Sequence, residues 1–131
     1  MTKLSALDAL MASNPVVTET VHIKRLGVDF EVKSLTGDDI QSLKAECTKV
    51  KRNGKKIEEY VDNDELSIAM IAKATINPDF SNADLMAKFG ASTSVQCVNK
   101  ALVAGEIFVL ADKITEISGL KDEDEIDELK N

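Results

Sequence analysis

The chain has 131 residues, a hydrophobic fraction of 44% and a formal net charge of −7 at pH 7. This length fits one domain, and the hydrophobic fraction supports a folded core rather than wholesale disorder. The acidic balance argues against nucleic-acid binding, which needs a basic face, and against anionic membranes; no run approaches the roughly 20 apolar residues of a membrane span.

The first predicted element is a short amphipathic helix that ends before Asn14-Pro15. Its apolar residues recur at three- and four-residue spacing, and they are Leu4, Leu7, Leu10 and Met11. Asp8 interrupts this short apolar stretch, so we do not predict a signal peptide.

A β-hairpin is predicted next, at about residues 17–34. Val21 and Ile23 alternate with polar neighbours, and the same alternation returns at Val28, Phe30 and Val32 after a turn near Leu26-Gly27. This pattern is typical of two paired strands with one buried face.

Two helices with a basic segment between them follow the hairpin. Thr36 and Asp39 have the spacing of a capping box. The segment "VKRNGKKIEEYV" at residues 50–61 contains Asn53-Gly54 and predicts a turn or a second small hairpin. The helix that begins near Asp62-Asn63-Asp64 is apolar around most of its circumference, so we expect it at the centre of the core, ending at Asn77-Pro78.

Three capped segments close the predicted domain. Ser81 is the expected N-cap of a short helix, and Ser92 or Thr93 that of the next. Gly105 interrupts or bends the chain before an apolar stripe with helical period, formed by Ile107, Leu110, Ala111, Ile114 and Ile117. Gly119 stands where a left-handed residue ends a helix.

These elements predict a mainly α fold, a compact multi-helix domain at residues 1–120 with an N-terminal β-hairpin. Residues 121–131 carry six acids and two lysines, a net charge of −4, and predict a flexible acidic tail or linker. Cys47 and Cys97 lie far apart in a chain without a disulfide framework, and we interpret both as reduced core thiols.

Patterns that carry catalysis or metal binding are weak in this sequence. His22, the only histidine, occupies a strand position opposite the buried face, which favours solvent exposure over a role as a base. The segment Asp62–Glu65 lacks the glycine and final glutamate of a calcium loop. Lys49–Lys56 has no interleaved aromatic residues for stacking on RNA bases. We therefore predict no catalytic residue, no metal and no cofactor, and interpret the protein as a binding module.

Several segments stand in a characteristic order along the chain. They are "FEVKSLTGDDI" at Phe30–Ile40, the basic loop Lys49–Lys56, "IAKATINPDFSNADLMAKFGAS" at Ile71–Ser92, "VNKALVAGEIFVLADKITEISGL" at Val98–Leu120, and the final Lys130-Asn131. Their order and spacing resemble the XkdN-like family of phage tail assembly chaperones, from long-tailed phages and prophages of Gram-positive bacteria.

The resemblance implies a role in the host cytoplasm during tail morphogenesis. Such chaperones are expected to coat the apolar, helical tape measure protein, keep it soluble, help recruit tail tube protein, and leave before the virion is complete. Self-association on the client is a further expectation. The alternative is a structural tail or connector subunit that stays in the virion.

Two hypotheses join what the resemblance implies to particular residues. Leu4, Leu7, Leu10 and Met11 are candidate client-binding residues, unless they complete the chain's own core. Leu129-Lys130-Asn131 can be encoded with the slippery string A AAA AAC, which suggests a ribosomal frameshift there and a longer second product.

Overall fold

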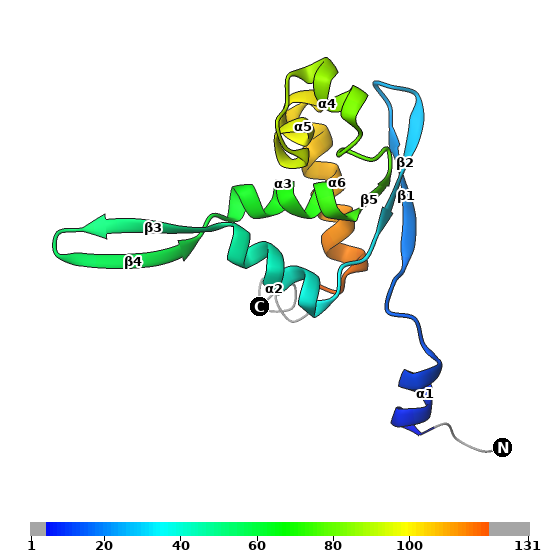
Figure 1. Cartoon of the computed structure of the whole chain (residues 1–131). Helices are drawn as coiled ribbons and strands as arrows, with labels where there is room; N and C mark the ends of the chain where they lie inside the picture. The colour runs from blue at the N-terminus through cyan, green and yellow to red at the C-terminus, as the bar shows by residue number, and fades with distance from the viewer. Residues whose placement is uncertain (1–4, 121–131) are drawn as a thin grey trace, which may run out of the picture.

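A computed structural model describes residues 5–120 (Figure 1). Leu4, the predicted acidic tail at residues 121–131 and the hypothetical frameshift site lie outside the described residues. The boundary between domain and tail at residue 120 therefore stays a prediction.

The described residues have a mixed α/β fold, with 50% in helices and 23% in strands. The helices and strands are α1 (Ala6–Ala12), β1 (Thr18–Ile23), β2 (Val28–Lys33), α2 (Gly37–Glu46), β3 (Thr48–Asn53), β4 (Lys56–Val61), α3 (Asn63–Ala74), β5 (Thr75–Asn77), α4 (Ala83–Phe89), α5 (Ser94–Ala101) and α6 (Ala104–Ile117). The prediction of a mainly α fold is wrong, because the strands form two antiparallel sheets, β1-β2-β5 and β3-β4.

The error has two physical sources. β5 has only three residues, too few for an alternating pattern, and its extended backbone is favoured by the proline that follows Asn77. The prediction carried the helix on through these residues, whereas α3 ends at Ala74. The β3–β4 segment was predicted as a turn or small hairpin, and it forms a full two-stranded ribbon of six paired residues on each strand.

The predicted N-terminal hairpin is confirmed. β1 and β2 pair in register from Thr18 with Lys33 to Ile23 with Val28, and β5 pairs with the other edge of β2. The inward side chains Val21, Ile23, Phe30 and Val32 are buried, so one face of the sheet belongs to the core. Val28 belongs to the same predicted set but is half exposed at the start of β2.

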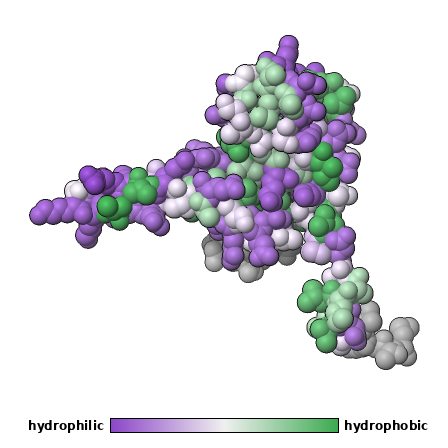
Figure 2. Space-filling model, in the orientation of Figure 1, coloured by the Kyte–Doolittle hydropathy of each residue, from purple (hydrophilic) through white to green (hydrophobic). Residues whose placement is uncertain are grey.

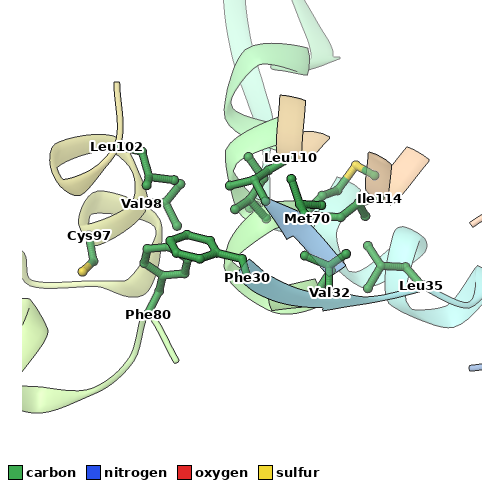
Figure 3. Close-up of a cluster of buried hydrophobic side chains, with 14 of the residues drawn as sticks. Phe30, Val32, Leu35, Met70, Phe80, Cys97, Val98, Leu102, Leu110 and Ile114 are labelled. Atoms are coloured by element: carbon green, nitrogen blue, oxygen red, sulfur yellow. The ribbon is translucent and has the colours of Figure 1, made fainter. Parts of the chain in front are cut away.

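Helices α3 and α6 pack together and contact the three-stranded sheet, with α5 packed on α3 and α4 on α5 (Figure 1). Phe30 of β2 meets Phe80 edge-on, with ring centroids 6.2 Å apart. Figure 3 shows this pair beside Val98, with Leu110 and Ile114 of α6 further along the same cluster. The predicted central position of α3 is confirmed, because Ala69, Met70, Ile71 and Ala74 are all buried.

The predicted helix caps are mostly confirmed. Thr36 and Asp39 form the reciprocal capping box, Asp62 caps α3, and Thr93 caps α5. The cap of α4 is Asn82 and not Ser81, because Ser81 instead hydrogen-bonds to Asp79.

Three further sequence expectations concern the C-terminal helices and the thiols. The chain breaks at Leu102 and Val103, so Gly105 lies in the first turn of α6. Gly119 takes the expected left-handed conformation, with φ of 72°. Cys47 and Cys97 are free and buried, and burial raises the pKa of both thiols.

None of the helices described in residues 5–120 has the length and hydropathy needed to cross a membrane.

Candidate protein-binding surfaces

Helix α1 presents an apolar stripe to solvent. Leu7, Leu10 and Met11 have helical spacing, and they are 66%, 72% and 76% exposed. No residue of α1 is buried, so the alternative that these three side chains complete the core does not hold. Ser5 is the N-cap of the helix, and its hydroxyl accepts a hydrogen bond from the Asp8 backbone N–H.

The path of the chain carries α1 away from the body of the molecule (Figure 1). The buried Ser34 hydroxyl accepts from the Val17 backbone N–H at 2.8 Å and donates to the Pro15 carbonyl at 2.9 Å. These bonds fix the connecting segment at the end of β2. Figure 2 shows the apolar surface of α1 standing apart from the rest of the protein.

A second apolar surface is an open groove between α3, α5 and α6, with a volume of about 440 Å³. Its apolar lining consists of Ile68, Ala104, Ile107, Phe108 and Ala111, and its polar lining of Asp64, Ser67, Asn99, Asp112 and Thr115. Phe108 is 75% exposed, which is unusual for a phenylalanine in a chain with only four. We call this surface the α3–α6 groove.

The sequence reading missed Phe108 because it followed the inward stripe of α6. That stripe is correct, since Leu110 and Ile114 are buried. Phe108 lies beside the stripe residue Ile107 but off the buried face. The sequence did contain one indication of an exposed apolar surface, namely a large aromatic residue off the apolar stripe of a predicted helix.

The wall of the groove formed by α6 is held in place by Arg25 in the β1–β2 turn. Arg25 donates from Nε and Nη2 to the two carboxylate oxygens of Glu106, both at 2.9 Å, and its Nη2 also donates to the Ala101 carbonyl at 3.3 Å. Glu106 additionally accepts from the Val103 backbone N–H. The hydrogen bonds from Arg25 lower the pKa of Glu106, which stays ionised and anchors the start of α6.

The β3–β4 ribbon projects from the body as an arm (Figure 1). At its base the Asp62 backbone N–H donates to the Cys47 carbonyl, and the Lys49 ammonium lies 2.8 Å from the Glu65 carboxylate. No residue of either strand is buried, so the arm contributes little to the core and much to the surface.

The chemistry of His22 fits a surface position. Its Nδ1 lies 2.8 Å from Asp29 Oδ1 across the β1–β2 hairpin, and both side chains are more than half exposed. Within the described part of the chain, no three His, Cys, Asp or Glu residues gather in a way that could hold a metal ion.

A family model described as the phage XkdN-like tail assembly chaperone protein matches residues 7–130. The chain belongs to this family. The resemblance seen in the sequence is thereby confirmed, and the family places the chain among phage tail assembly chaperones.

The fold of this tail assembly chaperone also has a solved counterpart. It is similar to the crystal structure of the protein YqbN, with a TM-score of 0.66 and 22% sequence identity, over 89% of this chain and 98% of that chain. At this identity the likeness concerns the fold alone. No curated protein sequence matches the chain.

Proposed function

We propose that this tail assembly chaperone binds the tape measure protein in the host cytoplasm, keeps it soluble and helps to recruit tail tube subunits. We further propose that it leaves before the virion is complete. The observation that carries the proposal is the exposure of four large apolar side chains. Leu7, Leu10, Met11 and Phe108 are each at least 66% exposed on a protein with a well-filled core.

The chemistry of the client suits both surfaces. A long helix with apolar stripes aggregates unless those stripes are covered. The α3–α6 groove can receive such a stripe in the helix-in-groove manner, and α1 can pack beside a client helix through its own stripe. Asp64 at the groove favours a client helix that carries Lys or Arg beside its apolar residues. Leu4 continues the spacing of the α1 stripe and belongs to the proposal, although it lies outside the described residues.

The expected energies are large enough to matter. Full burial of one Phe, Leu or Met side chain contributes about 1.5–3 kcal/mol. Losing one such contact therefore weakens binding roughly 10-fold to 150-fold. Many chaperone copies are expected to cover one client. A moderate loss of binding affinity in each copy therefore adds up along the length of the client.

Three finer elements of the proposal concern assembly around the client. Self-association on the tape measure extends the coat along it. Recruitment of tail tube protein occurs directly or through a longer form made by frameshifting at Leu129-Lys130-Asn131, and residues 121–131 then serve as the linker. The gene sequence tests the frameshift, which fails if codons 129–131 lack the slippery heptamer and no overlapping frame follows.

Co-expression with the longest downstream open reading frame, the expected tape measure protein, tests the proposed function. The soluble fraction of that protein should rise when this chaperone is present. It should fall again with Phe108→Ala, whereas Val109→Ala is the matched control, because Val109 is half exposed on α6 but does not line the groove. A client that is equally insoluble with and without the chaperone contradicts the proposal.

Mass spectrometry of purified virions separates a chaperone from a structural subunit. The proposal predicts that this chain is absent from virions or present only in traces. Many copies per virion would instead favour the retained tail or connector subunit.

A further inference from the structure

The arm carries a concentration of positive charge on an otherwise acidic protein. Residues 48–61 include five cationic and two acidic side chains, a net charge of +3, while the whole chain carries −7. Four of the cations, Lys51, Arg52, Lys55 and Lys56, lie in the outer half of the arm around the turn. None of these four forms an ion pair with any residue in the range 5–120.

One face of the arm carries apolar surface, and Lys51 and Lys56 lie on the opposite face. Cross-strand partners share a face, so the pairs Val50 with Glu59 and Arg52 with Ile57 lie on the same side of the ribbon. Val50 and Ile57 are diagonal neighbours there, and they are 64% and 63% exposed. Figure 2 shows this apolar surface within the polar arm. A partner that wraps the outer half of the arm should therefore combine several carboxylates, for the cations, with a few aliphatic side chains, for Val50 and Ile57.

The C-terminal segment of the same chain has that composition. Residues 121–131 read KDEDEIDELKN, in which six acids surround Ile126 and Leu129. Its charge of −4 complements the +3 of the arm, and its two aliphatic residues complement Val50 and Ile57.

The segment begins close enough to reach the arm. The Leu35 backbone N–H donates to Ser118 Oγ at 2.9 Å, which places the end of α6 beside the start of α2. From there α2 covers about 15 Å to the base of the arm, since a helix rises about 1.5 Å per residue. Lys51 lies about 10 Å further along β3, at about 3.4 Å per strand residue. Eight extended residues span up to about 27 Å, so acids near position 128 can reach Lys51 and Arg52.

We propose that the outer half of the β3–β4 arm binds the chain's own C-terminal acidic segment, residues 121–131. A short tether holds the segment at an effective concentration of about 1 mM, which favours the same chain over a second copy. Bound in this way, the segment neutralises a basic tip that would otherwise attract phosphate-rich polymers in the cell. This contact does not depend on tape measure binding, so an experiment that disproves one proposal leaves the other untouched.

Zero-length carbodiimide crosslinking of the full-length chain tests the contact. The reagent joins a lysine amine to a carboxylate only when the two touch. We expect crosslinks from Lys51, Lys55 and Lys56 to the acids at 122–128, about tenfold more frequent than crosslinks from the exposed Lys24 in the β1–β2 turn. They should fall about tenfold at 1 M salt, where the screening length is about 3 Å. In an equal mixture of isotope-labelled and unlabelled chains, the crosslinks should stay within one chain.

A second measurement uses a variant in which the six acids become the matching amides. The NMR signals of backbone amides at Lys51–Ile57 should shift between this variant and the natural chain, whereas those of the β1–β2 turn should not. Three results would each overturn the proposal: arm crosslinks no more frequent than those of Lys24, unchanged NMR signals of the arm, or crosslinks that join labelled to unlabelled chains. The third result would mean that the arm binds the segment of a second copy.

Discussion

Two side chains of helix α6 differ in exposure, and the proposed function assigns one to the core and the other to client binding. Ile114 is fully buried, whereas Phe108 is 75% exposed in the groove. We expect Ile114→Ala to lower the free energy of unfolding by about 2–5 kcal/mol, because it leaves a cavity in a packed core. Phe108→Ala should change it by less than about 0.5 kcal/mol. Urea unfolding followed by circular dichroism measures both, and equal destabilisation by the two substitutions would mean that Phe108 packs in the core.

The Arg25–Glu106 pair gives stability a specific pH dependence. Hydrogen bonds from Arg25 lower the pKa of Glu106 in the folded state. A lowered folded pKa contributes stability that is fully present above the unfolded pKa, at about 4.3 for glutamate, and is lost as pH falls through the folded pKa.

We therefore predict that Glu106→Gln unfolds at a lower temperature than the natural chain at pH 7, with a difference that shrinks below about pH 4. Glu19→Gln, an exposed site on β1, is the control and should match the natural chain at both pH values. A Glu106→Gln difference of the same size at pH 3 and pH 7 would assign the effect to packing rather than to the ion pair.

Most helix caps were predicted correctly because their side chains interact with residues close in sequence. The caps at Thr36 and Asp62 depend on neighbours three residues away, and both were predictable. Arg25 and Glu106 lie 81 positions apart, and no local pattern joins them. Phe108 is exposed because the packing of α3, α5 and α6 leaves its side chain uncovered. Such packing cannot be predicted from the local sequence.

Among the elements, the arm is expected to be separable from the fold. Deleting residues 51–53 and 56–58 removes three facing pairs and leaves Gly54-Lys55 as the turn between Val50 and Glu59, so the register is kept. Because no strand residue of the arm is buried, the melting temperature should change by less than about 4 °C. Thermal unfolding measures this, and a drop above about 10 °C would make the arm part of the cooperative fold.

Helix α1 should be dispensable for folding and required for the client. Replacing Leu7, Leu10 and Met11 by Ser should leave the melting temperature unchanged, because none of the three is buried. The same variant should lose most of its ability to solubilise the co-expressed tape measure protein. Ala9→Ser with Ala12→Ser, on the opposite face of α1, is the control and should retain it. If both variants solubilise the client equally, the α1 stripe is not a client contact.

Strand length decides which strands a pattern of alternating apolar residues can predict. Alternation over six residues was enough to predict β1 and β2. β5 pairs with β2 across more than 40 positions of sequence and has only three residues, so neither its pattern nor its partner was visible. The fold class was therefore wrong although the hairpin and the order of the helices were right.

For the whole molecule, a filled core coexists with apolar side chains exposed on α1 and in the α3–α6 groove. The family supplies the setting of phage tail assembly. In the proposed function the two surfaces cover an apolar helical client, and the acidic net charge would keep such coated complexes apart in solution.

Site-specific photo-crosslinking in the complex with the tape measure protein tests this account most directly. A photoreactive amino acid would replace Phe108 or Leu10, with Leu26 of the β1–β2 turn as an exposed control. The account predicts crosslinks to the tape measure protein from positions 108 and 10, and none above background from position 26. Equal crosslinking from all three positions, or crosslinking from position 26 alone, would contradict it.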